Sequence, residues 1–246
     1  MKRFLLKIFL LISFLFPEDQ KKEKILFIGN SFTFYWNLPL VIESMGKERG
    51  YDFDIFQSTI GGSSLKSHWL QENDLKSKEL VTFGNFSKVV LQDYSSNPLI
   101  NTEESLLYFN KFIDLVLEKN GHPFIFATWF YKGISEHSFE SIDPIQNVLN
   151  KLTHDKRASL VPVDTAFRIF QKRYPNVPLF TDDLKHPSPV GTYLAACLYF
   201  KIFTGQSPLG LARRYERKDE SGKKIFLGMV EKLTAERCQR IVDEII

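Results

Sequence analysis

A serine follows the first apolar run of the sequence, at the point where a strand is expected to end. The run from Ile25 to Ile28 leads into Gly29, Asn30 and Ser31. A glycine lets the backbone turn sharply there, and the turn would expose the hydroxyl of Ser31. A serine becomes a useful nucleophile only when a neighbouring base removes its proton. Alone, the tripeptide is more typical of a strand-end turn in which Ser31 or Asn30 caps the next helix.

A candidate base lies near the other end of the chain, in the stretch "DDLKHP". Asp183 precedes His186 by three residues, so its carboxylate can reach Nδ1 of the imidazole and leave Nε2 free. Pro187 stiffens the chain directly after the histidine. An isolated Asp-x-x-His is more typical of a capping acid and a surface histidine. Together with Ser31, the pair supplies the residue types that a serine nucleophile and its histidine base require.

Short apolar runs alternate along the chain with longer helical patterns, which is typical of parallel βαβ units. Several runs are apolar throughout, as expected of strands covered on both faces. Ligands of such sheets bind at the carboxyl ends of the strands, where Ser31 would lie. The predicted strands are Lys24–Ile28, Asp52–Gln57, Lys88–Gln92, Pro123–Thr128 and Ser159–Pro162.

Apolar residues at helical spacing predict helices between and after these strands. A charged, glycine-containing stretch at 215–224 is expected to be a surface loop. The predicted helices are 106–117 with Gly121 as C-cap, 190–198 ending at Gly205, and a C-terminal helix with Thr234 as N-cap.

The first residues have the pattern of a targeting segment. Lys2 and Arg3 precede an apolar stretch from Ile8 to Phe16, a length typical of a signal peptide. We therefore expect 1–16 to be a signal peptide or N-terminal anchor, 17–24 a charged linker, and 25–246 a single domain. Export to the periplasm or outside the cell follows from this interpretation. A buried N-terminal helix is the alternative.

Composition limits the possible partners. The 246 residues are 43% hydrophobic with a net charge of +3, and acidic residues separate the basic ones, so nucleic-acid binding is not expected. Cys197 and Cys238 are expected to be buried free thiols, although an exported protein also permits a disulfide. Contact with a membrane is expected only through the N-terminal segment.

The Gly-x-Ser turn after the first strand and the Asp-x-x-His-Pro motif together resemble the SGNH hydrolase superfamily, also called GDSL-like esterases. The resemblance runs from about Ile25 to about Leu211. It implies a three-layer α/β/α sandwich with a mostly parallel, five-stranded, flavodoxin-like sheet. It also implies Ser31 as nucleophile, His186 as general base and acid, and Asp183 as its orienting partner. No metal or cofactor is implied.

The same resemblance implies three donors to the oxyanion of the reaction. They are the backbone N–H groups of Ser31 and of Gly62, with Gly61 as the alternative, and a side-chain amide after the third strand. The family usually has Gly-x-Asn-Asp at that last place, whereas this chain has "VVLQDYSSNP". We assign the amide to Gln92, with Asn97 as the alternative.

Other features mark the chain as similar to a less characterised bacterial branch of the superfamily. Asn30 stands where the common motif has aspartate, and "PVD" begins at Pro162. A neutral amide can still bond across the turn, so this departure is mild.

The remaining candidates lack the spacing that chemistry requires. None of His68, His122, His137 and His154 has an acid at motif spacing, and no Cys/His cluster has zinc spacing. His68 follows the Gly-Gly loop and could touch substrate, but a surface position is expected. Asp182 is expected to face solvent. Four aromatic residues in the predicted strand-end loops suit substrate walls or packing equally: Tyr35, Trp36, Trp129 and Tyr131.

The sequence therefore predicts a serine hydrolase acting on a carboxylic ester, with a short acyl or acetyl group on a glycan as the expected substrate. A lipid or thioester is the next substrate class, because the motif specifies the reaction and the loops set the substrate. A non-catalytic module is the rival. It is either a flavodoxin-like protein, in which "GNSFT" would cradle a phosphate, or a degenerate hydrolase that only binds glycans. The flavodoxin-like alternative leaves Asp183 and His186 unexplained. The oligomeric state stays open.

Overall fold

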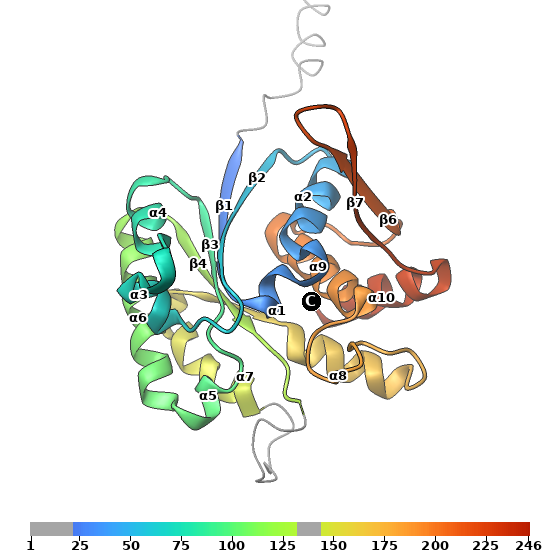
Figure 1. Ribbon diagram of the computed structural model, residues 1–246. Coiled ribbons are helices and arrows are strands. Elements are labelled where there is room, and N and C mark those ends of the chain that lie inside the picture. Colours follow the sequence, from blue (N-terminus) through green and yellow to red (C-terminus); the bar gives the residue numbers. More distant parts are fainter. Residues whose placement is uncertain (1–21, 132–143) are drawn as a thin grey trace, which may run out of the picture.

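The computed structural model of the protein describes residues 22–131 and 144–246. Its centre is a parallel five-stranded sheet with the order β2-β1-β3-β4-β5 (Figure 1). All five predicted strands are confirmed, with ends that differ from the prediction by at most two residues. The strands are β1 (Glu23–Gly29), β2 (Phe53–Thr59), β3 (Lys88–Leu91), β4 (His122–Ala127) and β5 (Ser159–Pro162).

Helices cover both faces of this sheet, which makes the predicted three-layer α/β/α sandwich (Figure 1). One face carries α2 (Leu38–Glu48), α8 (Val163–Arg173), α9 (Pro189–Thr204) and α10 (Lys232–Ile245). The other carries α3 (Leu65–Leu70), α4 (Ser77–Phe83), α6 (Thr102–Glu118) and α7 (Pro144–Leu149). Two short helices, α1 (Ser31–Phe34) and α5 (Asn97–Ile100), follow β1 and β3, and 3₁₀ turns span 35–37, 72–74 and 150–156.

The apolar run of β1 shows why a continuous hydrophobic strand suits this sheet. Ile25 and Phe27 pack into the core beneath α2 and α9, whereas Leu26 and Ile28 pack into the core beneath α6. All four side chains are fully buried. Since successive side chains of a strand point to opposite faces, both faces must be apolar when both are covered. Burial of both faces of β1 holds the end of the strand in place, and Ser31 follows that end by two residues.

Two helix ends differ from the prediction. The helix α6 ends at Glu118, and Asn120 rather than Gly121 takes the left-handed conformation, with φ 60°. The C-terminal helix starts at Lys232, and its N-cap is Glu231, whose carboxylate accepts from the backbone N–H of Thr234. Asparagine tolerates left-handed backbone, and a carboxylate caps a helix as a hydroxyl does. The cap at Gly205 is confirmed, with φ 71°.

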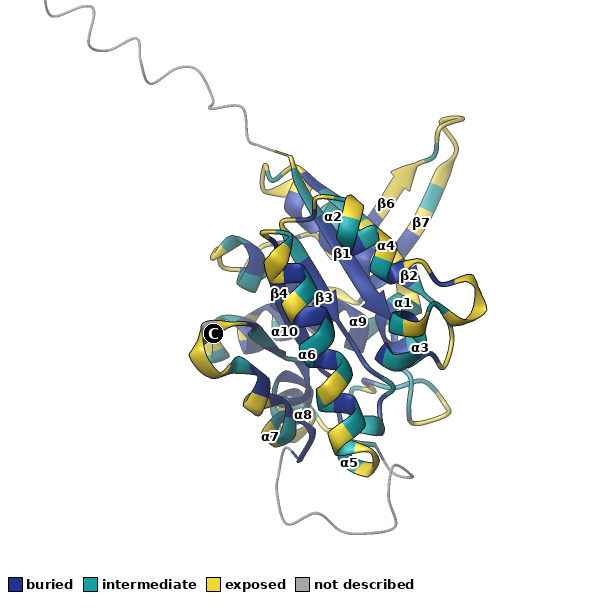
Figure 2. Ribbon diagram, turned by 90° about the vertical axis from the view of Figure 1, so that its left-hand side faces the viewer, coloured by how far each residue is buried: buried dark blue, intermediate teal, exposed yellow. Residues whose placement is uncertain are grey.

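The predicted loop 215–224 is instead part of a hairpin. The strands β6 (Arg214–Lys218) and β7 (Lys224–Met229) pair antiparallel and project from the body, with most of the hairpin exposed (Figure 2). One side of the hairpin packs on the domain through Tyr215 and Leu227, which are both buried. Residues 219–223 form the largely exposed turn between the two strands, so this part of the predicted surface loop is confirmed.

The predicted N-terminal segment 1–16 lies outside the described residues, as does most of the predicted linker. The last two residues of that linker, Glu23 and Lys24, belong to β1. In the part of the chain that the structure describes, no helix is long and apolar enough to cross a membrane.

Candidate active site

Ser31, His186 and Asp183 form one hydrogen-bonded chain at the carboxyl end of the sheet. Oγ of Ser31 lies 2.8 Å from Nε2 of His186, and Nδ1 of His186 lies 2.5 Å from Oδ2 of Asp183. An ionised carboxylate only accepts hydrogen bonds, so the proton of the neutral ring belongs on Nδ1 and Nε2 accepts from the serine hydroxyl. The arrangement gives a serine a base, and the base an orienting anion.

Asp183 is held by the backbone of its own loop. Its Oδ1 accepts from the hydroxyl of Thr181 and from the backbone N–H groups of Lys185 and His186, all at 2.8–2.9 Å. Desolvation acts to raise the pKa of this carboxyl. The hydrogen bonds from His186, Lys185 and Thr181 outweigh it and hold the pKa of Asp183 well below its usual range. Asp183 is therefore an anion at any pH suited to an assay.

Two tryptophans fasten the loop that carries His186. The indole of Trp36 donates to the carbonyl of Pro187, and the indole of Trp129 donates to the carbonyl of Lys185, both at 2.9 Å. Trp129 is only 3% exposed, so it is a packing residue. Trp36 is 45% exposed and is available to touch a ligand.

Aromatic rings also fix the orientation of the imidazole. The ring of Tyr35 stacks on His186, with centroids 4.1 Å apart and planes at 12°, and Phe32 meets it edge-on at 5.4 Å. The hydroxyl of Tyr131 lies 3.1 Å from Oγ of Ser95, and its ring meets Phe32 edge-on, with centroids 6.0 Å apart, so its contact with the imidazole runs through Phe32. Of the four aromatic candidates, Tyr35 therefore has the most direct contact with His186.

The turn that presents Ser31 is bonded to the end of β3. The backbone N–H of Asn30 and the hydroxyl of Thr33 both donate to Oε1 of Gln92 at 2.9 Å. A side chain on Gly29 would collide with Oγ1 of Thr33 and Oε1 of Gln92. The glycine is therefore required by this close approach.

The contacts of Gln92 do not support the role of oxyanion donor that was expected for it. Its side chain is fully buried, its Oε1 accepts the two bonds just described, and its Nε2 donates to the carbonyl of Asp93. With no exposed surface, the amide of Gln92 holds the turn from beneath. The alternative, Asn97, lies in α5, and its Nδ2 is 3.4 Å from Oδ1 of Asp93.

Asn30 links three segments beneath Ser31. Its Oδ1 accepts from the backbone N–H of Phe32, which caps α1, and its Nδ2 donates to the carbonyls of Ser63 and Asp93 at 2.9 and 3.4 Å. The side chain is 3% exposed. These contacts explain why an amide stands where the common motif has aspartate. An ionised carboxylate at this position would face two carbonyl oxygens.

We expect Asn30→Asp to lower the free energy of unfolding by about 2–3 kcal/mol at pH 7, because a buried donor becomes a charged acceptor opposite two acceptors. The deficit should shrink in acid, where the carboxyl is protonated and donates again. Urea unfolding at pH 7 and pH 4 measures both effects. Asn37→Asp is the matched control, since Asn37 donates to one carbonyl, that of Leu227, at a half-buried site. Equal stability of the two variants at pH 7 would contradict this account.

The loop after β2 approaches the same turn. Gly62 has φ 75°, a left-handed conformation that favours glycine, and is exposed, as is Gly61. The backbone N–H of Ile60 donates to the carbonyl of Gly29 at 3.4 Å, and Oγ of Ser63 donates to the same carbonyl at 3.0 Å. The loop that carries Gly62 is thus fixed to the residue two positions before Ser31.

Two polar residues behind these turns are buried, which the sequence did not lead us to expect. Asp93 accepts from the backbone N–H of Leu65 and from the hydroxyl of Ser105, and burial raises its pKa. His68 is fully buried, which corrects the expected surface position, and burial lowers its pKa to about 4 despite a hydrogen bond with the carbonyl of Gly29. The sequence did hold a signal for the burial of His68, because this histidine lies inside an apolar helical pattern, six residues after the Gly-Gly loop.

Burial of neutral His68 predicts a pH-dependent stability. The unfolded chain binds a proton near the ordinary histidine value of ~6.5. The folded chain does so near pH 4, so stability is lost as the pH falls between these values. From pH 7 to pH 4.5 this residue should lower the free energy of unfolding by about 2–3 kcal/mol.

Urea unfolding at the two pH values tests this, with His68→Gln as the comparison. The raised pKa of Asp93 acts in the opposite direction and is common to both proteins. His68→Gln should therefore show a smaller loss on acidification than the wild type. Parallel losses in the two proteins would show that His68 does not titrate as inferred.

The other candidates do not join the site. His122 lies at the start of β4, where its Nε2 is 2.8 Å from Oγ of Ser159, and His154 is exposed. Asp182 is exposed as expected, and His137 lies outside the described residues. Cys197 and Cys238 are buried free thiols, as expected. Among residues 22–131 and 144–246, no group of three or more His, Cys, Asp and Glu side chains could hold a metal ion.

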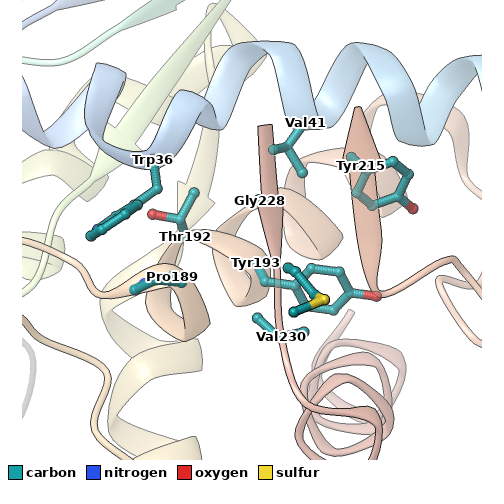
Figure 3. Close-up of a pocket in the computed structure, with 9 residues that line it drawn as sticks. Trp36, Val41, Pro189, Thr192, Tyr193, Tyr215, Gly228 and Val230 are labelled. Carbon is teal, nitrogen blue, oxygen red and sulfur yellow. The ribbon is translucent and has the colours of Figure 1, made fainter. Parts of the chain in front are cut away.

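An apolar pocket lies behind Trp36, between α2, α9 and β7. Figure 3 shows Trp36 beside Pro189 and Thr192 at one end of the pocket, with Tyr193, Tyr215 and Val230 towards the other. Its volume is about 10 Å³, which is room for roughly one water molecule. The pocket is too small for an acyl chain in this structure.

Neither a family model nor a curated protein matches the chain. Solved structures do match it. A proposed SGNH hydrolase from Slackia heliotrinireducens has a TM-score of 0.65 at 20% identity over 74% of this chain and 99% of that chain. A DUF4886 family protein from Bacteroides uniformis has a TM-score of 0.69 at 18% identity over 91% and 94% of the two chains. The acetyl xylan esterase AlAXEase has a TM-score of 0.57 at 17% identity over 73% and 98%. The chain therefore has the fold of the SGNH hydrolases, as its motifs predicted.

Proposed function

We propose that this protein is a serine hydrolase that cleaves a carboxylic ester through an acyl-enzyme. The observation that carries the proposal is the chain from Oγ of Ser31 through the imidazole of His186 to the carboxylate of Asp183, with separations of 2.8 and 2.5 Å. The two segments are 155 positions apart in the sequence. Packing of an α/β sheet alone gives no reason for these three side chains to meet at the carboxyl end of β1.

In the first half of the reaction, Oγ of Ser31 attacks the ester carbonyl while Nε2 of His186 takes its proton. The resulting imidazolium lies between the substrate and the anion of Asp183, which stabilises its charge. His186 then gives the proton to the leaving alcohol. The stacked ring of Tyr35 keeps the imidazole in the orientation that both transfers need.

Backbone N–H groups are the proposed donors to the oxyanion. Ser31 is the first residue of α1, and the first N–H groups of a helix have no partner within it. The N–H of Gly62 is the second proposed donor, from the loop bonded to Gly29. Each such donor contributes about 3–4 kcal/mol to lowering the barrier in enzymes where it has been removed. We do not assign Gln92 as the third, side-chain donor that the resemblance implied.

In the second half, His186 activates a water molecule that attacks the acyl-Ser31 ester. The proton returns through the same Nε2 atom, so one histidine serves both halves. The chain of Ser31, His186 and Asp183 needs no metal or cofactor for these steps.

We propose short acyl or acetyl esters of a glycan as the substrate class. The similarity of the fold to a protein named an acetyl xylan esterase supports this choice. The small volume behind Trp36 also disfavours a long acyl chain at that place. Lipid and thioester substrates are the next classes. The apolar segment at 8–16 supports export of the enzyme, either cleaved or anchored.

A substrate screen tests the proposal. Acetylated sugars and acyl p-nitrophenyl esters of increasing chain length are incubated with the purified protein, with Ser31→Ala as the blank. We expect hydrolysis that falls as the acyl chain lengthens. Turnover that rises with chain length would reassign the substrate to lipids, and no turnover above the blank with any ester would contradict a carboxylic ester hydrolase.

A further inference from the structure

A buried chain of hydrogen bonds runs from β2 to the turn that presents Ser31. Oγ of Ser58 lies 2.7 Å from Oγ of Ser77, which lies 2.6 Å from Nδ1 of His68. On the other side of the ring, Nε2 of His68 lies 3.0 Å from the carbonyl oxygen of Gly29 and 2.9 Å from Oγ of Ser63. All five residues are buried, and the imidazole is completely enclosed.

The partners determine which way the hydrogen bonds run. The carbonyl of Gly29 can only accept, so Nε2 of His68 carries the proton. Nδ1 of the neutral ring must then accept from the hydroxyl of Ser77, which in turn accepts from Ser58. The neutral state follows from burial, which lowers the pKa of His68 to about 4. Every donor in the chain points towards Gly29.

The two contacts of Nε2 join the segments that hold the proposed oxyanion donors. Gly29 lies two residues before Ser31, and Ser63 directly follows Gly62. Asn30 closes the junction, because its Nδ2 donates to the carbonyl of Ser63. The imidazole thus occupies the corner between the two segments, and its other side is fixed to α4 by Ser77.

We propose that His68 is a positioning residue that sets the spacing between the N–H of Ser31 and the N–H of Gly62, and this rests on the proposed function. Oxyanion donors act only when they lie about 2.7–3.1 Å from the developing charge. Gly61 and Gly62 themselves are exposed, so the place of the Gly62 N–H depends on the buried contacts of the neighbouring Ser63. The Nε2–H group of His68 supplies a fixed point from within the core.

A pair of substitutions separates this role from general support of the fold. His68→Leu introduces an apolar side chain of similar bulk and removes both ring nitrogens. His68→Gln can still place an N–H group towards Gly29. Because a displacement of about 1 Å can cost 10²-fold in rate, we expect kcat of His68→Leu to fall by about 10–100-fold with KM within about twofold of wild type. His68→Gln should recover most of that kcat.

His122→Leu is the matched control. It also removes a histidine with one serine partner, but at the start of β4, at the opposite end of the strands from Ser31. Its kcat should equal that of wild type. If His68→Leu does not fold, Ser77→Ala takes its place. Loss of the donor to Nδ1 frees the ring to turn, so kcat should fall severalfold without a change in KM.

The outcomes distinguish the two proposals. Wild-type protein that neither hydrolyses esters nor reacts with a fluorophosphonate would overturn the proposed function itself. An active wild type with an unchanged kcat in folded His68→Leu, or in Ser77→Ala where that variant is used, would overturn the positioning role alone. A fall in kcat that His122→Leu shares, or that His68→Gln does not relieve, would also overturn it.

Discussion

Replacing Ser31 by alanine is expected to abolish ester hydrolysis, with a loss in kcat on the order of 10⁶-fold, because His186 then has no hydroxyl to activate. The change removes one half-buried hydroxyl, which is hydrogen-bonded to Nε2 of His186. The fold should therefore persist, with a circular-dichroism spectrum and a urea midpoint close to those of wild type. Initial rates on the best substrate of the screen, measured at saturation, give the effect.

Ser95→Ala is a control for this variant. Ser95 lies beyond β3, and its hydroxyl contacts Tyr131 rather than His186. It should keep most of the activity. If Ser31→Ala retained turnover comparable with Ser95→Ala, Ser31 would not be the nucleophile, whatever its distance from His186.

The second large effect is expected for Asp183→Asn, with a fall in kcat of about 10⁴-fold, as is seen when the anion of a serine–histidine pair is replaced by an amide. An amide can donate to Nδ1 and so favours the wrong tautomer, in which Nε2 carries the proton and cannot accept from Ser31. The loss of the anion also removes the stabilisation of the imidazolium. Saturation kinetics at constant pH measure the change in kcat.

Asp182→Asn serves as the neighbouring control, because Asp182 is exposed and directly precedes Asp183. It changes the same charge at almost the same place. A loss in Asp182→Asn as large as in Asp183→Asn would indicate an effect of local charge, and the orienting role of Asp183 would be wrong.

The parts of this structure that could be predicted depend on local patterns. Five strands were predicted because each is a short apolar run between turn residues, and burial on both faces made the runs continuous. Ser31, Asp183 and His186 were singled out because each lies in a short motif beside a strand end or a proline, and the structure brings the three together. These features need no knowledge of which distant side chains they meet.

The features that were predicted wrongly depend on contacts between distant segments. Gln92 directly follows β3, but its amide turns inward, where its Oε1 accepts from Asn30 and Thr33, about 60 positions earlier. His68 is buried because Gly29, Ser63 and Ser77 enclose it from three different segments. Charge density at 215–224 suggested a loop, yet packing of Tyr215 and Leu227 makes a hairpin. The type of a polar residue does not by itself indicate which distant group will be its hydrogen-bond partner.

The most direct test of the central claim is mass spectrometry of the protein after reaction with a fluorophosphonate. This reagent phosphonylates a serine that a base has activated, so it needs no knowledge of the natural ester. The account predicts one adduct per chain, on the peptide that contains Ser31, and none in Ser31→Ala. An unlabelled wild type, or an adduct on any other serine, would contradict the assignment of Ser31 as the nucleophile.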